Sequence, residues 1–180
     1  MREMPTVYFV CIGNTCRSPM AAAIFNQIVR GRGIERVRAD SFGIVPFYGD
    51  NDEVRRLRES AVQKVMGEAD GLKEHRPKGI EEIAFREGDR IVLLDSSKIE
   101  GFAAGIRRNP SFRGKQFQML AMETEDPFGG PVENYIDCCL FLKEGIEERF
   151  GILTSGVRRE AENQLKSADL HRDMEMEDAR

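Results

Sequence analysis

Four short segments of the chain have the residue pattern of β-strands. Residues 7–12 (VYFVCI) and 89–95 (DRIVLLD) form continuous apolar runs, which are typical of strands covered on both faces of a sheet. Residues 37–42 and 117–122 are weaker strand candidates. The pattern therefore predicts a sheet of about four strands.

Apolar residues at helical spacing follow each of these segments. They predict helices within residues 20–28, 54–65, 80–84, 96–107 and 132–150. Strands that alternate with crossover helices indicate an α/β fold with parallel strands. We expect one three-layer domain, a doubly wound sheet with helices on both faces.

Length and composition limit the classes of protein that remain. With 180 residues, of which 41% are hydrophobic, the chain can bury one ordinary core. We expect this domain to cover residues 1–153, and residues 154–180 to form a charged tail that is a frayed helix or disordered. A net charge of −4 argues against a general affinity for nucleic acid. No secretory signal or membrane-spanning run is visible, so we expect a cytoplasmic protein with no membrane partner.

The loop after the first predicted strand, residues 11–19 (CIGNTCRSP), holds the candidate chemistry. Ligands of a doubly wound sheet bind beyond the carboxyl ends of its strands. A glycine and short polar residues let backbone N–H groups turn inward around an anion, and the following helix adds its positive end. Arg17 can hold two phosphate oxygens with its planar fork. Because these surroundings favour a thiolate at Cys11, the loop predicts a nucleophile aimed at phosphorus. Ser18 either donates to the sulfur or caps the helix, and Pro19 fits the first helical position.

The segment VCIGNTCRSPMA resembles the signature loop of the low-molecular-weight protein tyrosine phosphatases almost residue for residue. The similarity extends over roughly residues 5–152, and it includes four further segments: residues 41–43 (SFG, where the family usually has Ser-Ala-Gly), 75–76 (HR), 89–95 (DRIVLLD) and 126–130 (DPFGG). The resemblance implies a cysteine-dependent phosphatase that acts on a phosphorylated protein or peptide.

Phosphate transfer to Cys11 needs a general acid on the opposite side of the phosphate. Asp126 is the candidate, because it precedes the last helix on a loop at the same edge of the sheet, and the family's acid maps onto it. Cys11 then attacks phosphorus while Asp126 protonates the leaving group, and water later hydrolyses the phosphocysteine. Arg17 and the loop amides hold the phosphate ion, so we expect no metal and no cofactor.

The resemblance also implies a set of supporting residues. In the family, the residues corresponding to Asn14 and Ser41 form a hydrogen bond that holds the loop, and three aromatic residues are placed as walls around the substrate. For the aromatic residues, packing in the core or at the rim is an equal alternative. The expected substrate-binding residues are Ile12, Gly13, Asn14, Thr15, Cys16, Ser18, Ser41, Phe47, Tyr48 and Phe128.

Two details bear on the substrate. Thr15 stands where the ordinary tyrosine phosphatases carry an aliphatic residue, and Asp126 is followed by one aromatic residue where animal members have two. Both details resemble the protein arginine phosphatases of the same family. Because a threonine at this position also occurs in relatives of unclear preference, we predict phosphotyrosine as the substrate, with phosphoarginine as a close alternative.

Two other functions stay open. Arsenate reductase shares the scaffold but needs two further thiols, and the adjacent Cys138 and Cys139 would point about 100° apart on a helix. A phosphate-binding module without catalysis is the other alternative, although it would need no nucleophile.

The remaining polar residues have simple expectations. Only Cys139 of the adjacent cysteine pair lies on the apolar face of the last predicted helix, and four such cysteines suit reduced thiols better than disulfides. Cys16 either pairs with the nucleophile under oxidation, as in some family members, or packs beneath the loop. We expect Asp95 to cap the segment that follows it, with an anchor for Arg17 as the alternative, and His75 to face solvent.

Overall fold

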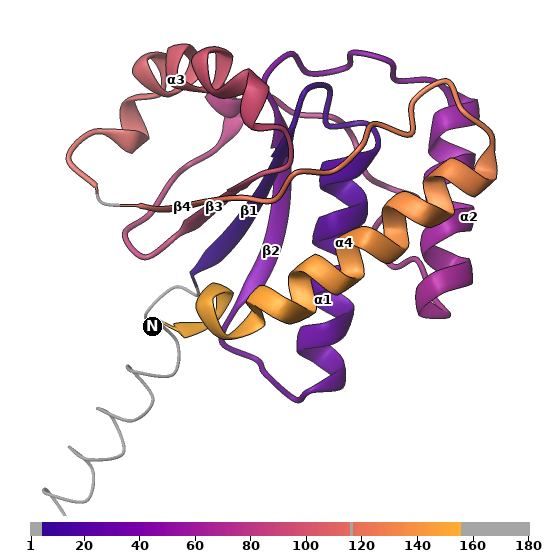
Figure 1. Cartoon of the computed structure of the whole chain (residues 1–180). Helices are drawn as coiled ribbons and strands as arrows, with labels where there is room; N and C mark the ends of the chain where they lie inside the picture. Colours follow the sequence, from indigo (N-terminus) through magenta and orange to yellow (C-terminus); the bar gives the residue numbers. More distant parts are fainter. Residues whose placement is uncertain (1–4, 116, 156–180) are drawn as a thin grey trace, which may run out of the picture.

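The computed structural model describes residues 5–115 and 117–155. Four parallel strands form one sheet in the order β2-β1-β3-β4 (Figure 1). The strands are β1 (Thr6–Cys11), β2 (Arg38–Gly43), β3 (Arg90–Leu93) and β4 (Gln118–Ala121). All four predicted strands are therefore present, and their parallel pairing confirms the predicted α/β class.

Four α-helices connect and cover the strands. They are α1 (Arg17–Gly31), α2 (Asp52–Met66), α3 (Ile99–Arg108) and α4 (Val132–Leu153). The helix expected within residues 80–84 is only one 3₁₀ turn, Ile80–Glu82, because Ile83 already has extended backbone angles. Pro19 is the third residue of α1 and not the first; it still costs no hydrogen bond, since the first four helical N–H groups have no acceptor within the helix.

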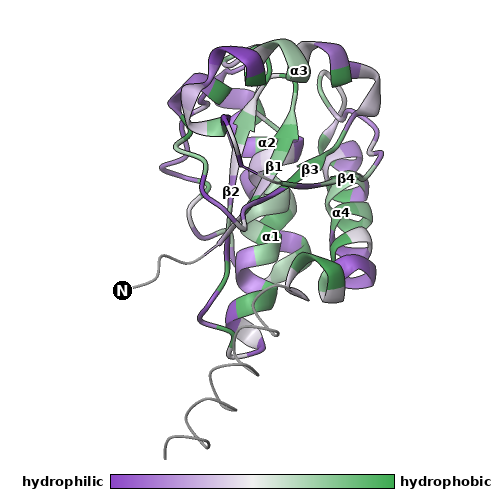
Figure 2. Cartoon of the chain, turned by 90° about the vertical axis from the view of Figure 1, so that its left-hand side faces the viewer, coloured by the Kyte–Doolittle hydropathy of each residue, from purple (hydrophilic) through white to green (hydrophobic). Residues whose placement is uncertain are grey.

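Alternate residues of β1 point into two separate cores. Val7 and Phe9 belong to the larger core, which α1, α2 and α4 cover. Tyr8 and Val10 belong to the smaller core, on the side of α3. Figure 1 shows α3 on one side of the sheet and the other three helices on the opposite side, and Figure 2 shows hydrophobic residues concentrated on the strands and on α1 and α4. These layers confirm the expected three-layer arrangement.

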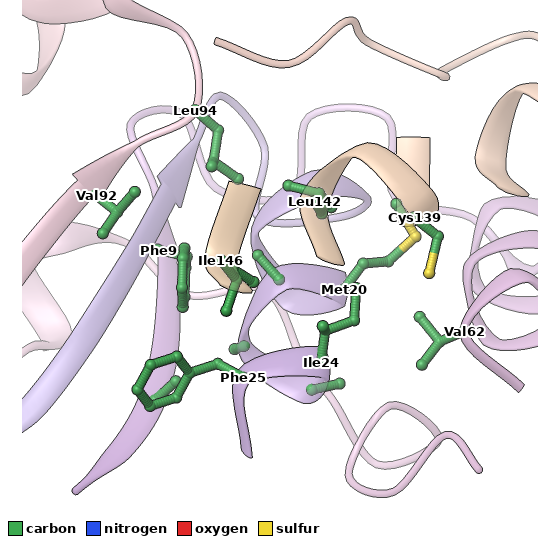
Figure 3. Close-up of a cluster of buried hydrophobic side chains, with 14 of the residues drawn as sticks. Phe9, Met20, Ile24, Phe25, Val62, Val92, Leu94, Cys139, Leu142 and Ile146 are labelled. Atoms are coloured by element: carbon green, nitrogen blue, oxygen red, sulfur yellow. The ribbon is translucent and has the colours of Figure 1, made fainter. Parts of the chain in front are cut away.

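The larger core joins the sheet to the helix that begins at the candidate loop (Figure 3). Its fully buried members come from the sheet, from α1 and from α4, and include Phe9, Val92, Leu94, Met20, Ile24, Phe25, Leu142 and Ile146. Helix α2 packs mainly on α1 and α4. Since close-packed interiors resist displacement, this core holds the end of β1 and the start of α1 in one place.

The sheet order places the carboxyl ends of β1 and β3 side by side. From β1 the chain leads to β2 on one side and later to β3 on the other, so the direction of winding reverses between β1 and β3. Cys11 lies opposite Gly43 of β2, and Val10 lies opposite Leu93 of β3. Ligands of such sheets bind at this reversal point.

Two expectations concern the ends and surroundings of the chain. In the described part, no helix has both the length and the apolar character needed to cross a bilayer. Most of the expected tail, residues 156–180, lies outside the described residues, so the boundary after residue 153 stays a prediction.

Candidate active site

The loop between β1 and α1 is held by hydrogen bonds to all six of its successive carbonyl groups. Three of them accept backbone N–H groups from the segment after β2: Cys11 from Ile44 at 3.1 Å, Ile12 from Val45 at 2.8 Å and Gly13 from Phe47 at 3.1 Å. The other three accept from elsewhere: Asn14 from His75 Nε2 at 2.9 Å, Thr15 from Arg58 Nη1 at 2.7 Å and Cys16 from the Met20 N–H at 3.2 Å.

These outward carbonyls determine where the loop amides point. Within a trans peptide unit, the C=O of one residue and the N–H of the next point in opposite directions. The N–H groups of residues 12–17 are therefore directed toward the inside of the loop, where α1 adds the positive end of its dipole. Such a ring of donors binds a tetrahedral oxyanion.

Asn14 fixes the shape of the loop from within. Its backbone is left-handed, with φ at 57°, and its side chain is fully buried. Asn14 Nδ2 donates to Ser18 Oγ at 3.0 Å and to Ser41 Oγ at 2.9 Å, and its Oδ1 accepts from the Lys78 N–H at 2.9 Å. The hydrogen bond from Asn14 to Ser41 that the resemblance implied is therefore present.

The same network reaches the sulfur of Cys11. Ser18 Oγ lies 3.0 Å from Cys11 Sγ and already accepts a hydrogen bond from Asn14. When Cys11 is a thiolate, only Ser18 has a proton to share between these two atoms, so its hydroxyl donates to the sulfur. This hydrogen bond stabilises the thiolate, and donation to the sulfur is one of the two roles expected for Ser18.

Two glycines allow the close approach of backbone segments around the loop. A Cβ atom on Gly13 would lie 2.1 Å from the carbonyl oxygen of Tyr48, and a Cβ on Gly43 would lie 2.7 Å from that of Ile12. Any larger residue would push the loop away from the segment that binds its carbonyls. Glycine is needed here for lack of space, since neither residue has a positive φ.

Arg17 and Asp126 are brought together although 109 positions separate them in the sequence. Arg17 is 3% exposed, and its Nη2 donates to Asp126 Oδ2 at 2.8 Å. Its Nη1 donates to the carbonyl of Thr124 at 3.0 Å and lies 3.8 Å from Asp95. Asp95 also accepts from the Ser97 N–H, so it has both of its expected roles.

A shallow cavity over the loop contains most of the expected site residues. It is lined by Cys11, Ile12, Gly13, Thr15, Cys16, Arg17, Tyr48, Asp126 and Phe128. Tyr48 and Phe128 form its exposed rim, with ring centroids 6.2 Å apart. Phe47 is not among the lining residues, and it lines a neighbouring pocket instead.

Two supporting side chains were not predicted to act at the loop. His75 was expected to face solvent, but it is partly buried and donates to Asn14 through Nε2. Arg58, on α2, is fully buried and binds the carbonyls of Thr15, Leu72 and His75. Its Nε is buried without a hydrogen-bond partner among the described residues.

Burial changes the pKa of both side chains. It lowers the pKa of His75 to about 4, and the nearby cations Arg58 and Lys78 act in the same direction. His75 is therefore neutral near pH 7. Burial also lowers the pKa of Arg58, but a guanidinium stays protonated at neutral pH, so Arg58 adds a positive charge behind the loop.

The remaining thiols are buried. Cys16 Sγ lies 3.7 Å from Thr15 Oγ1 and 3.9 Å from the Tyr135 hydroxyl, and burial raises its pKa to about 11. This placement agrees with packing beneath the loop. Cys138, predicted to lie off the apolar face, is also buried, and it lines a groove together with Arg17 and Asp126. In the described residues, no group of three His, Cys, Asp or Glu side chains is placed to hold a metal ion.

An anion-binding loop with a cysteine at its base, an arginine at its end and an aspartate above it is the arrangement of cysteine-dependent phosphatases. The family model described as low molecular weight phosphotyrosine protein phosphatase matches residues 6–163, so the chain belongs to this family.

Individual relatives come from both branches considered above. The chain is 30% identical over 138 residues to the protein-arginine-phosphatase of Geobacillus stearothermophilus. The aligned region covers 72% of this chain and 82% of that relative. It is 28% identical over 153 residues to the low molecular weight protein-tyrosine-phosphatase YfkJ of Bacillus subtilis, covering 81% and 93%. The solved structure of the low molecular weight protein tyrosine phosphatase from T. tengcongensis matches with a TM-score of 0.65 and 27% identity, over 83% of this chain and 99% of that one.

We predict that Arg58→Lys impairs the loop although it keeps the charge. One ammonium group cannot reach carbonyls on two separate segments, so Thr15 loses its support. Hydrolysis of para-nitrophenyl phosphate should fall about ten- to a hundredfold in kcat, and the free energy of unfolding in urea by roughly 2–4 kcal/mol. Arg56→Lys, on the exposed side of the same helix, is the matched control. Wild-type kcat in Arg58→Lys would contradict the support role.

The pH dependence of the free energy of unfolding tests whether His75 is neutral in the folded protein. Between pH 4 and 6.5 the folded protein binds fewer protons at His75 than the unfolded chain, so the free energy of unfolding rises with pH across this window. Acidification from pH 6.5 to 4 should therefore cost roughly 2–3 kcal/mol through this residue. In His75→Gln, urea titrations should show a correspondingly flatter profile. An equal flattening in the variant of the other histidine, His171→Gln, would contradict the assignment to His75.

Proposed function

We propose that the protein is a protein phosphatase that hydrolyses phosphotyrosine through a phosphocysteine intermediate. The observation that carries this proposal is the ring of inward amides around Cys11, which the six outward carbonyls impose. Phosphoryl transfer depends mainly on positioning and charge stabilisation, and a rigid ring of donors supplies both.

The reaction follows from the placement of three residues. The thiolate of Cys11 attacks phosphorus, the bond from phosphorus to the ester oxygen breaks, and Asp126 gives its proton to the leaving oxygen. Water then attacks the phosphocysteine, Asp126 accepts a proton from it, and Cys11 leaves as a thiolate with release of phosphate. Arg17 and the loop amides hold the other phosphate oxygens in both steps.

The contact from Arg17 to Asp126 connects substrate binding to the acid. In the absence of substrate, the Arg17 fork binds Asp126 at 2.8 Å. An incoming phosphate competes for the same guanidinium N–H groups, so Asp126 is freed to turn toward the leaving group above the cavity. Its side chain is 43% exposed, which leaves room for that movement.

The surroundings of the site fit a protein substrate in a reducing compartment. Tyr48 and Phe128 form an exposed aromatic rim that can contact the ring of a phosphotyrosine. All four cysteines are free thiols, which fits the cytosol.

Thr15 supports phosphoarginine as the second candidate. Its hydroxyl lines the cavity, donates to the carbonyl of Tyr48 at 3.1 Å and lies 3.7 Å from the Cys16 thiol. One lone pair therefore remains to accept a hydrogen bond from a guanidinium. A phenyl ring offers no such donors. The relative from Geobacillus stearothermophilus carries the name protein-arginine-phosphatase.

Turnover by single variants tests the mechanism. We expect wild type to hydrolyse para-nitrophenyl phosphate and a phosphotyrosine peptide, Cys11→Ser to lose at least about a thousandfold in kcat, and Asp126→Asn to lose about a hundred- to a thousandfold. The loss in Asp126→Asn should be smaller for para-nitrophenyl phosphate, whose leaving group needs less protonation. If wild type is inactive but phosphate raises its thermal midpoint, the protein is a phosphate-binding module and the proposal is wrong.

Substitution of Thr15 separates the two substrates. Thr15→Val removes the hydroxyl at nearly constant volume, and Thr15→Ser keeps it. The ratio of kcat/KM for phosphoarginine to that for phosphotyrosine peptides should fall about tenfold in Thr15→Val and stay near wild type in Thr15→Ser. An unchanged ratio in Thr15→Val would remove the argument for phosphoarginine.

A further inference from the structure

A second pocket adjoins the active-site cavity. We call it the basic pocket; it has a volume of about 440 Å³ and is lined by Phe47, Arg55, Lys73, Glu74, His75, Arg76 and Pro77. Two of these residues connect it to the phosphate loop. Phe47 directly precedes Tyr48 of the rim, and His75 binds the carbonyl of Asn14. A peptide bound at the active site therefore passes close to this pocket.

The positive charge of the basic pocket comes from Lys73 and Arg76. Arg55 is already matched by both carboxylate oxygens of Asp50, and His75 is neutral. Lys73 and Arg76 are exposed and have no hydrogen bond or ion pair within the described residues. Glu74 offsets one of the two charges in part, so a net positive charge faces the pocket.

Phe47 is held in an unfavourable position at the entrance. Its backbone is left-handed, with φ at 68°, and its side chain is 59% exposed. A bulky residue gains little from packing in this state, and strained residues of this kind concentrate at binding sites. Phe47 adds an apolar side chain to the lining that also contains Lys73 and Arg76.

A second groove beside the active site carries the opposite charge. This acidic groove has a volume of about 740 Å³, shares Arg17 and Asp126 with the active-site cavity, and has no lining residue in common with the basic pocket. Its lining contains five carboxylates, Asp95, Glu123, Glu125, Asp126 and Asp137, and Arg17 is the one cation among the described residues that line it. An acidic side chain placed on this side would be repelled.

We propose that the basic pocket binds an aspartate or glutamate side chain of the phosphorylated substrate, on the side of the phosphorylated residue that lies away from the acidic groove. The free cations Lys73 and Arg76 pair with the carboxylate, and Phe47 contacts its methylene groups. The acidic groove disfavours the reverse orientation of the same peptide. This inference rests on the proposed phosphatase function and names the sequence context that the site selects.

A peptide scan tests the proposal. Two series, one with phosphotyrosine and one with phosphoarginine, carry alanine at all flanking positions except a single glutamate, placed in turn from four residues before to four after the phosphorylated residue. We expect glutamate on one side to raise kcat/KM about three- to tenfold over the all-alanine peptide, mainly through KM, and glutamate on the other side to lower it. The preference should shrink as salt is raised from about 0.05 to 0.5 M.

Reversal of the charges in the basic pocket tests whether this pocket causes the glutamate preference. The double variant Lys73→Glu/Arg76→Glu should lose the glutamate preference, measured as the ratio of kcat/KM between the glutamate and all-alanine peptides, and should prefer lysine at the same position. The matched control is Arg56→Glu/Lys64→Glu, which reverses two exposed charges on α2 outside the pocket lining and should keep both the preference and the basal activity.

The possible outcomes distinguish the two proposals. If the all-alanine peptides are hydrolysed and glutamate has no effect or the same effect on both sides, the basic pocket is not a subsite, while the phosphatase function stands. An equal loss of preference in the control variant would assign the effect to net charge and overturn the proposal. If neither series nor para-nitrophenyl phosphate is hydrolysed, the phosphatase function fails and the subsite falls with it.

Discussion

The outward hydrogen bonding of six successive carbonyl groups is the constraint on which the active site depends. A loop of this length has many possible backbone conformations, and its amides would bind water in most of them. Donors from the segment after β2, from His75, from Arg58 and from α1 select one conformation. The ring of inward N–H groups is thus a consequence of contacts on the outside of the loop. Catalytic preorganisation here is provided by contacts outside the loop, away from the phosphate that it would hold.

This arrangement concentrates positive charge at the phosphate loop, where it does not stabilise the protein unless an anion is bound. Within the described part of the chain, Arg58 is buried with three carbonyl partners and no carboxylate in hydrogen-bond contact. Asn14 has a left-handed backbone, and the amides of residues 12–17 face one another. Each feature lowers stability unless the neighbouring structure or an anion compensates. The compensation comes from the core that joins β1, α1 and α4, and a bound phosphate would add to it.

The catalytic groups and the residues proposed to select the substrate lie in different parts of the site. The thiol, the arginine and the inward amides lie in a buried loop between β1 and α1. The residues proposed to determine substrate preference lie on more exposed segments. They are Tyr48 and Phe128 of the rim, the cations Lys73 and Arg76, and the carboxylates that line the acidic groove. Folds commonly combine a rigid scaffold with variable loops in this way.

Local patterns in the sequence were enough to predict the strands, the main helices, and the loop with Cys11, Arg17 and Ser18, because each is encoded by residues close together in the chain. Asp126 was proposed from its place at the same edge of the sheet together with the family resemblance, and the structure places it beside Arg17. The roles of Arg58 and His75, the full burial of Cys138 and the place of Phe47 outside the active-site cavity were decided by the tertiary structure. Each of them depends on segments that are distant in sequence and meet only after the sheet has formed, and hydrophobic periodicity records which face of an element is buried without specifying its partner.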